Sequence, residues 1–511
     1  MTNSKKLIFR QFSQVMLMGL GLVVALYAFW TYRSYLGFAA ADDVNANDIA
    51  VGAIRFDAWF SPPNYDNESR LDSPKWHSRL PFYAKTLEDD TVEVRGDSQE
   101  IVDREIQYAS ESGLDYWAFD YYGIYGKKPR KENSAFSGLH YGLRHYLSSD
   151  YKNELNFALN VTGEWIFNGN DDKNLSKWNK QFVPTVIQLM REPGYQTVLD
   201  DRPLIFIYKM DKAAEKMGGE EQLRIGIANL RKAALRNGLE DPYIVGLLWG
   251  YTHPAERVTK YGVDAVSAYT AHRGNPYDDG KLHPYSELMK SNTEFWDRLS
   301  AETTDVVPIL NVGWDYRPNL GVGDQSTIDT YEGSPIYKHA KPEEIKNHLI
   351  NAIKWIRNHP DKTKAKAILI YSWSEYPEGG VLAPTLDEGN ARLRAISTVL
   401  NKASKNNSYK PVEPLYVGIK KLDTSLQIYW SDELAESKNF KTFWVAVRKK
   451  SSNEQVAGGS TKAKGSYDIP HSKLSDGEYV VRVQALYEDD ADRIMQAINI
   501  KVDGDKIWVV D

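Results

Sequence analysis

Two glutamates three residues apart stand out in the stretch YSWSEYPEGG, residues 371–380. Glu375 and Glu378 follow a run of strand-forming residues, Pro377 lies between them, and two glycines come next. Two carboxylates held side by side cannot both ionise without a large electrostatic cost, so the pKa of one of them rises. Such a pair can supply one acid and one base for general acid–base catalysis. The alternative interpretation is a solvated turn whose proline and glycines only redirect the chain.

The composition excludes several other kinds of chemistry. The 511-residue chain has no cysteine, which excludes disulfides, catalytic thiols and cysteine-ligated zinc or iron–sulfur sites. Metal-binding, phosphate-loop and dinucleotide-binding motifs are not found in the sequence, so we expect no metal and no nucleotide cofactor. A net charge of −6 gives no reason to expect a nucleic-acid partner. The 14 Trp and 32 Tyr suit large cores, and they also suit sugar binding, because aromatic rings stack on apolar sugar faces.

Eight apolar, strand-like runs alternate with amphipathic helical stretches in the middle of the chain. The runs begin at Ile49, Leu114, Leu155, Arg202, Pro242, Val263, Asp305 and Ala365. Short apolar runs bounded by turn residues are typical of strands buried on both faces. Their alternation with helices predicts an α/β fold, a (β/α)8 TIM barrel over residues 42–407. A doubly wound open sheet is the alternative, although a long loop, about residues 61–96, stands where such a sheet usually carries a phosphate loop.

Three helices have clear sequence signals. Ser98 is the expected N-cap of a helix that ends at Gly113, with Ile101, Ile106 and Ala109 on its buried face. Residues 341–360 begin with a proline and two glutamates in the first turn, and residues 389–405 follow the last strand. These helices frame the first and last strands of the predicted barrel.

The carboxyl ends of barrel strands form the mouth where active sites lie. These ends carry acidic and aromatic residues, which fits a carbohydrate cleft, and glycoside hydrolysis needs an acid for the leaving oxygen and a second carboxylate. Single members of the set can equally pack a core, cap a loop or form a satisfied polar pair. With Glu375 and Glu378 as the catalytic pair, the candidate substrate-binding residues are Asp57, Trp59, Trp76, Asp120, Tyr122, Glu164, Trp165, Trp249, Tyr269, His272, Trp314, Trp373 and Tyr376.

After residue 407 the hydrophobic pattern changes to period two. Short alternating strands with turn signals between them predict a small all-β, immunoglobulin-like sandwich over residues 408–511. The stretch LSDGEYVVRVQA resembles the penultimate strand of a fibronectin type III module, with Tyr479 in the place of its corner tyrosine. A spacer or packing module and a sugar-binding module are both open as roles for it.

The first 41 residues read as a membrane anchor or signal segment. Lys5, Lys6 and Arg10 precede an apolar run of about 18 residues from Val15 to Tyr32, which is the length of a short transmembrane helix. The positive charges predict that the amino terminus is inside and the bulk of the chain is outside the cytoplasm, in the periplasm or at the cell surface. Secretion after signal cleavage near residues 39–42 is the alternative.

The stretch YSWSEYPEGGVLAP resembles the W-x-E-W-x-E-G signature of glycoside hydrolase family 99 and its WbsX-like relatives in bacterial surface-polysaccharide clusters. The helix GNARLRAI and the region QEIVDREIQYASESGLDYWAFDYY are also similar to that family. The resemblance spans about residues 49–400. It implies an endo-acting, retaining α-mannosidase-like enzyme that works through a 1,2-anhydro sugar. Glu375 matches the residue that takes the proton from the 2-hydroxyl, and Glu378 matches the residue that protonates the leaving group and then activates water.

The chain departs from the family pattern between the two glutamates. Tyr376 replaces the usual tryptophan, Pro377 stands where histidine or a small residue is common, and the glycines are doubled. These changes affect the shape of the sugar subsites, so a different sugar of a surface glycan is an open alternative to mannose.

The sequence thus predicts an exported glycosidase that acts on an oligo- or polysaccharide. A non-catalytic glycan-binding or envelope scaffold protein is the alternative from another functional class. A third reading keeps hydrolysis but takes Glu164 or Asp120 as the partner carboxylate.

Overall fold

The structure is a computed structural model. It describes residues 46–60, 67–87, 91–123, 139–166, 174–250, 253–272, 281–320, 334–400, 417–430, 440–452, 454–461, 465–487, 494–504 and 506–510. Within these ranges no helix is long and apolar enough to cross a membrane. The predicted membrane segment and the predicted domain boundaries at residues 41 and 407 lie outside them.

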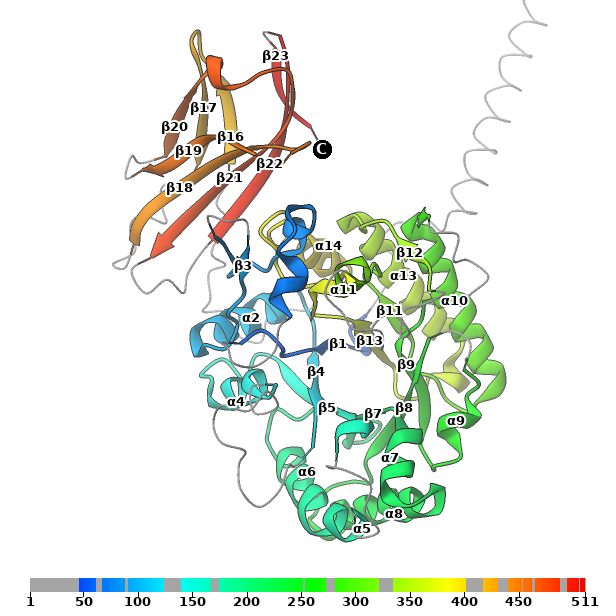
Figure 1. Ribbon diagram of the computed structural model, residues 1–511. Helices are drawn as coiled ribbons and strands as arrows, with labels where there is room; N and C mark the ends of the chain where they lie inside the picture. Colours follow the sequence, from blue (N-terminus) through cyan, green and yellow to red (C-terminus); the bar gives the residue numbers. More distant parts are fainter. Residues whose placement is uncertain are drawn as a thin grey trace, which may run out of the picture.

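A parallel barrel forms the centre of the larger domain (Figure 1). Its neighbouring strands run in the order β11-β13-β1-β4-β5-β7-β8-β9. Val266 N donates to Asp305 O and Val307 N donates to Val266 O, each at 3.1 Å, and these bonds close the ring between β9 and the chain entering β11. The strands are β1 (Ala50–Arg55), β4 (Tyr116–Tyr121), β5 (Asn156–Thr162), β7 (Arg202–Tyr208), β8 (Tyr243–Trp249), β9 (Ala265–Thr270), β11 (Ile309–Asn311) and β13 (Ala367–Tyr371). The predicted TIM barrel is therefore confirmed, and the open-sheet alternative is wrong.

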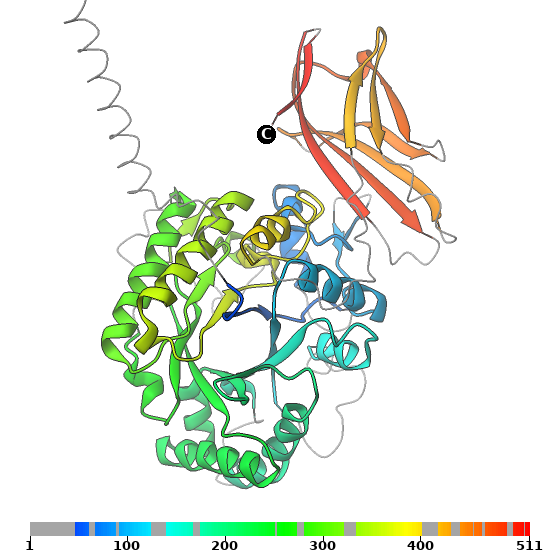
Figure 2. The same ribbon diagram turned by 180° about the vertical axis from the view of Figure 1, so that it is seen from behind.

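Helices surround the barrel in both ribbon views (Figures 1 and 2). The Ser98 side chain accepts a hydrogen bond from Ile101 N at 3.3 Å, and Gly113 has a φ of 83°, so both predicted ends of the first helix are confirmed. The helices are α2 (Gln99–Glu111), α4 (Tyr141–Ser148), α5 (Asn174–Lys177), α6 (Val183–Met190), α7 (Met210–Met217), α8 (Glu220–Arg236), α9 (Glu256–Thr259), α10 (Tyr285–Glu302), α11 (Arg317–Leu320), α13 (Pro342–Asn358) and α14 (Ala391–Leu400).

Short elements lie in the loops between the barrel strands, including the long loop after β1. They include the 3-10 turns η2 (Glu68–Leu71), η3 (Pro74–Arg79), η4 (Gly163–Trp165) and η7 (Tyr376–Glu378), and the small strands β2 (Lys85–Thr86), β3 (Val92–Glu93), β6 (Thr197–Val198), β10 (Leu282–His283), β12 (Ile336–Tyr337), β14 (Ser374–Glu375) and β15 (Gly380–Val381). The predicted long loop thus carries local order of its own.

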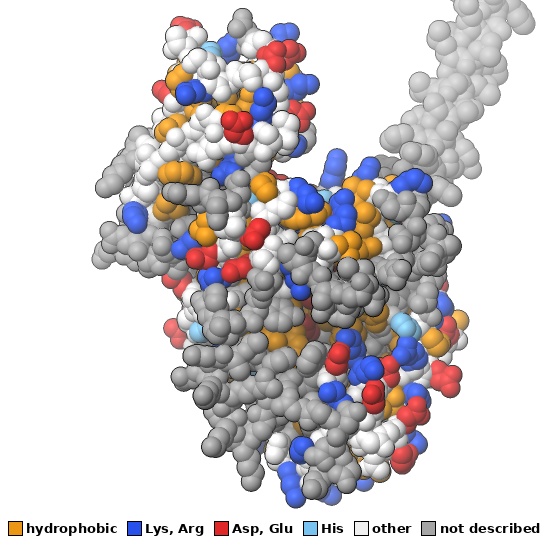
Figure 3. All heavy atoms as spheres, viewed as in Figure 1, with side chains coloured by type: hydrophobic (Ala, Val, Ile, Leu, Met, Phe, Trp, Pro, Cys, Tyr) orange, Lys and Arg blue, Asp and Glu red, His pale blue; other side chains and the backbone are white. Residues whose placement is uncertain are grey.

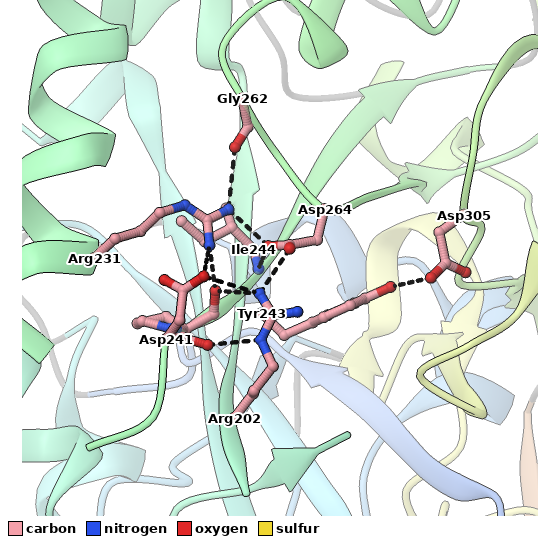
Figure 4. A network of polar contacts seen from close by, with 9 residues as sticks. Arg202, Arg231, Asp241, Tyr243, Ile244, Gly262, Asp264 and Asp305 are labelled. Carbon is pink, nitrogen blue, oxygen red and sulfur yellow. Dashed lines mark hydrogen bonds and ion pairs between the residues drawn. The ribbon is translucent and has the colours of Figure 1, made fainter. Parts of the chain in front are cut away.

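A partly buried polar network joins the amino-terminal ends of the barrel strands (Figure 4). Arg202 and Arg231 both reach the carboxylate of Asp264, at 2.6 and 2.7 Å, and Asp241 pairs with the same two guanidinium groups. The Tyr243 hydroxyl donates to Asp305 at 2.7 Å. Since this end of a TIM barrel lies opposite the active-site mouth, the network contributes to stability and leaves the catalytic end free.

The C-terminal part of the chain forms two antiparallel sheets, which lie outside the ring of helices on the side of β3 (Figures 1 and 2). Their inner faces share a separate apolar core that includes Leu426, Phe443, Val481 and Ile500. One sheet holds β16 (Val417–Lys421), β17 (Ser425–Trp430) and β20 (Ser466–Pro470), and the other holds β18 (Phe440–Lys449), β19 (Gln455–Thr461), β21 (Gly477–Tyr487), β22 (Ile494–Asp503) and β23 (Lys506–Val510).

Two strands of these sheets, β19 and β23, were not anticipated from the sequence. Gly458 and Gly459 of β19 have φ angles of 136° and 154°, and the register against β18 shifts near Val447, so this strand lacks a regular alternation.

The Tyr479 hydroxyl donates to Ser475 O at 2.7 Å, which is the kind of contact a corner tyrosine makes. The fibronectin-like assignment of the module stays a prediction.

Acidic and basic side chains are intermingled over α7, α8 and α9 on the face drawn in Figure 3. Arg257 pairs with Asp211, and Lys260 pairs with Glu220. Exposed pairs of this kind add little stability because solvent screens them.

Candidate active site

The two glutamates lie on a tight hairpin at the carboxyl end of β13. Glu375 pairs with Gly380 across the two short strands β14 and β15, and η7 carries Glu378 between them. Gly379 has a φ of 74°, which favours glycine. A Cβ on Gly380 would overlap the ring of Tyr371, so the doubled glycines follow from how closely the hairpin packs on β13.

Glu375 is buried and held by two hydrogen bonds. The Tyr269 hydroxyl donates to its Oε1 at 2.7 Å, and its backbone N–H donates to the Ser372 side chain at 2.9 Å. Burial raises the pKa of Glu375 well above 4.5, and the charges of Glu378 and Asp120 raise it further. The raised pKa thus falls on Glu375, the residue to which the resemblance gives the base role, so that role requires a neighbour that favours its ionised form.

Glu378 is also buried, with 9% of its surface exposed. The Tyr371 hydroxyl donates to its Oε2, and the Glu378 carbonyl accepts from Asp315 N at 2.7 Å. Arg79 donates to the carbonyls of Asp315 and Pro377, at 2.7 and 3.2 Å. The loop after β11 therefore fixes the turn that presents Glu378.

A third carboxyl, Asp120 at the end of β4, reaches the same place. Its Oδ1 accepts from Asn160 Nδ2 at 2.6 Å, and its Oδ2 lies 2.9 Å from the Tyr269 hydroxyl that also contacts Glu375. Burial raises the pKa of Asp120 to about 8. The predicted site residues Asp120, Tyr269 and Glu375 are thus brought into one hydrogen-bonded chain.

Aromatic rings form a continuous wall beside these carboxyls. Tyr208 stacks on Tyr269 with ring centroids 4.7 Å apart, and His272 stacks on Trp314 at 4.0 Å. Trp249 lies about 6 Å from both pairs, at 6.2 Å from Tyr269 and 6.0 Å from Trp314. Burial lowers the pKa of His272 to about 3, so this ring is neutral and acts as part of the wall.

Glu164 lies on the same side of the mouth but in a different setting. It is half-buried and pairs with Lys209. A pocket of about 230 Å³ lies beside this pair and is also lined by Tyr208, Trp249 and His253. The position suits a group that contacts a bound ligand at the edge of the cleft.

Several predicted site residues make buried contacts behind the mouth. Asp57 accepts from Arg55 Nε at 2.8 Å, and Arg55 also pairs with Glu105 of α2 at 2.7 Å. The indole N–H of Trp373 donates to Glu105 at 2.9 Å. Burial raises the pKa of Asp57 to about 6. The structure therefore places Asp57 and Trp373 in a network between β1 and the helices.

Trp59 and Tyr376 support the glutamate hairpin from below. The Trp59 indole donates to Ser374 O at 3.0 Å, and its ring meets the ring of Tyr376 edge to face at 4.9 Å. Both side chains are almost fully buried. The ring of Tyr376, which stands between the two glutamates, thus packs inward against Trp59.

Two further predicted residues, Trp76 and Tyr122, are buried as well. The ring of Trp76 lies 4.7 Å from the Arg79 guanidinium and 5.2 Å from that of Arg317. Tyr122 is buried near Tyr269, and its backbone N–H donates to His140 at 3.1 Å. The side chain of Trp165 is not among those described.

The sequence analysis missed three residues that contact the site or act on its carboxyls electrostatically. Tyr208 ends β7 and faces the charges of Glu378, Glu164, Asp120 and Glu375. Tyr371 ends β13, and the positive charge of Arg70, on η2, acts on Glu375. The two tyrosines occupy strand-end positions, so the rule that located the other candidates would have found them.

A family model described as Glycosyltransferase WbsX matches residues 166–396, a span that contains both hairpin glutamates. This part of the chain is WbsX-like. The match confirms the predicted resemblance to the WbsX-like relatives of glycoside hydrolase family 99. WxcX of Xanthomonas campestris pv. campestris, from two strains, is 26% identical over 230 residues, which are 43% of this chain and 30% of WxcX. The chain therefore spans about a third of the length of these curated relatives.

Solved structures similar to this chain include glycoside hydrolases. The family 99 endo-α-mannosidase of Bacteroides thetaiotaomicron is 15% identical with a TM-score of 0.42, and 68% of this chain and 96% of the other are covered. An endo-β-1,4-mannanase of Thermotoga petrophila is 9% identical with a TM-score of 0.30, covering 80% and 95% of the two chains. At these scores the likenesses carry no argument about activity.

Proposed function

We propose that the barrel is a glycoside hydrolase that cleaves a surface polysaccharide or an α-mannoside-like linkage outside the cytoplasm. Glu375 and Glu378 are its acid–base pair. The observation that carries the proposal is the hairpin itself, which holds two carboxyls at the barrel mouth, each contacted by a tyrosine hydroxyl and flanked by an aromatic wall. Rings of this kind stack on sugars while carboxyls act at the glycosidic bond.

The proposed reaction is endo-acting and retains configuration through neighbouring-group participation. Glu375 takes the proton of the sugar 2-hydroxyl as its oxygen attacks C1, and Glu378 protonates the departing glycosidic oxygen. Water, deprotonated by Glu378, then attacks C1 and breaks the C1–O2 bond of the 1,2-anhydro sugar, and the 2-oxygen takes back its proton from Glu375. Because the sugar supplies its own nucleophile, both carboxyls can come from one hairpin.

Paired glutamine variants test the proposal. Glu375→Gln and Glu378→Gln each remove one ionisable group with little change in shape, and each should lower kcat by about 10² to 10⁴. Unfolding curves and circular dichroism should stay close to those of the parent chain. Hydrolysis that survives both substitutions would remove the proposed pair from the mechanism, whereas glycan binding without cleavage in every variant would favour a binding protein.

Sugar transfer is a second candidate, and the description of the matching family model favours it. In that reaction an acceptor hydroxyl takes the place of water at C1. Incubation of the chain with a labelled donor glycan and a series of acceptor sugars separates the two. Elongated acceptors favour transfer, and reducing ends alone favour hydrolysis.

A further inference from the structure

The Tyr269 hydroxyl contacts two buried carboxyls at once, and this geometry limits where protons can be. It lies 2.7 Å from Glu375 Oε1 and 2.9 Å from Asp120 Oδ2. A phenol has one hydrogen and can donate it to one of the two. The other contact joins two oxygens at hydrogen-bond distance and therefore needs a proton from a carboxylic acid.

A base must be ionised, so the proposed role of Glu375 assigns that proton to Asp120. Asn160 Nδ2 donates to Asp120 Oδ1 at 2.6 Å, so the other oxygen, Oδ2, is the one left to hold a hydrogen and point it at Tyr269. Tyr269 then donates to Glu375. The chain of bonds runs in one direction, from Asn160 through Asp120 and Tyr269 to Glu375.

We propose that Asp120 is a positioning residue that works as a neutral acid: it orients the Tyr269 hydroxyl toward Glu375 and so keeps Glu375 ionised as the base. The proposal rests on the proposed function of Glu375. It explains how a deeply buried carboxyl can still accept a proton from a sugar hydroxyl. A neutral Asp120 also removes one of the two negative charges that face Glu375.

Other ionisable groups face this chain. They are Asp57 and Glu378 near Asp120, Tyr122 and Tyr371 near Tyr269, and Glu378 and Arg70 near Glu375. Apart from Arg70 these groups are negative or neutral, so they favour the neutral form of Asp120. Burial raises the pKa of Asp120 to about 8, although the hydrogen bonds from Tyr269 and Asn160 act to lower it.

Two substitutions at one position test the proposal on the full chain. Asp120→Asn mimics the neutral acid, because its amide oxygen can accept from Asn160 and its N–H₂ can donate to Tyr269. Asp120→Val has a similar size and neither group. We expect the valine variant to lose at least about tenfold in kcat and the asparagine variant to recover most of that loss.

The pH profile separates orientation from a merely structural role. Activity of the parent chain should fall above about pH 8 as Asp120 ionises, and Asp120→Asn should lack this alkaline limb. On a Tyr269→Phe background, Asp120→Asn should have no further effect on the limb. An asparagine variant as inactive as the valine variant would mean that Asp120 acts as a carboxylate and would overturn the proposal.

A measurement without substrate keeps this test independent of the enzymatic proposal. Since folding raises the pKa of Asp120, its neutral form stabilises the fold fully below about pH 4, and this stability is lost as the pH rises to about 8. The difference in unfolding temperature, Asp120→Asn minus the parent chain, should therefore increase from pH 4 to pH 8 and stay constant above pH 8. If this difference increases with pH but no glycan is hydrolysed, the neutral Asp120 is supported and the hydrolase is refuted. If the difference is the same at every pH, the neutral Asp120 is refuted.

Discussion

Each carboxyl of the hairpin is matched with one tyrosine hydroxyl, Tyr269 for Glu375 and Tyr371 for Glu378. The two tyrosine rings meet edge to face with centroids 5.6 Å apart, so the acid–base pair is positioned by adjacent hydroxyls from β9 and β13. A hydroxyl can stabilise a carboxylate without supplying a full positive charge. The carboxyls therefore keep the ability to exchange protons, which a lysine or arginine partner would suppress.

Removal of the Tyr371 hydroxyl tests this positioning. Tyr371→Phe keeps the ring that packs on Gly380 and deletes the hydroxyl that donates to Glu378. We expect kcat to fall by about tenfold or more, because a hydrogen bond to a charged group contributes about 1.5–3 kcal/mol. Steady-state kinetics and thermal unfolding of the same preparation measure it. A variant with the parent kcat would show that this donor has no part in catalysis.

At the scale of elements, the hairpin after β13 depends on its glycines. Gly380 lies against the Tyr371 ring, and the space at Gly313 is filled by the carbonyl of Gly379. The loop after β11 and the hairpin are thus packed backbone to backbone. A side chain at either contact must displace the turn that carries Glu378.

Gly380→Ala should therefore lower kcat even under conditions in which the variant remains folded. The matched control is Gly389→Ala in the following loop, where a Cβ meets nothing within 4 Å although its φ of 56° adds strain. We expect the control to lose about 1 kcal/mol of stability and keep its kcat. Equal kinetic constants for both variants would contradict the proposed role of the hairpin packing.

The opposite end of the barrel should affect stability alone. Tyr243→Phe removes the donor to Asp305 in the network of Figure 4 and leaves a buried carboxyl oxygen short of a partner. We expect a loss of about 1–3 kcal/mol in the free energy of unfolding, measured by denaturant titration, with kcat unchanged. A large fall in kcat at constant KM would contradict this division between the two ends.

At the scale of the whole molecule, buried ionisable groups set the pH dependence of stability. Burial raises the pKa values of Asp57, Glu111 and Asp120 to about 6, 7 and 8, and stability from their neutral forms is lost as the pH rises toward those values. Burial lowers the pKa values of His140 and His272 to about 4 and 3, so stability is lost below pH 6.5 as the unfolded chain takes up protons. The unfolding temperature should therefore decline from pH 6.5 to pH 8, and a rise over that interval would contradict these assignments.

The sequence predicted the barrel because each buried strand leaves a local apolar run that needs no knowledge of its neighbours. It also located Glu375, Asp120 and Tyr269 by their place at strand ends. It could not separate rings that line the mouth from rings such as Trp59 and Trp373, since both kinds alternate in the same way and only the packing of α2 and the hairpin distinguishes them. β19 was missed because its glycines break the alternation that marks a strand.

The location of the chain is a further whole-molecule proposal. An amino-terminal anchor with the barrel outside the cytoplasm would place the enzyme next to surface glycans. A protease added to intact cells or spheroplasts should then degrade the barrel, while a cytoplasmic control protein stays intact. Protection equal to that of the control would contradict the proposal.

The central claim is that the hairpin glutamates cleave a glycan, and a hydrolysis screen tests it most directly. The full chain and its Glu378→Gln variant are incubated with α-mannans and bacterial surface polysaccharides, and released oligosaccharides are identified by mass. We predict release by the parent chain from at least one glycan and none by the variant. Release at the same rate by both proteins would contradict the account.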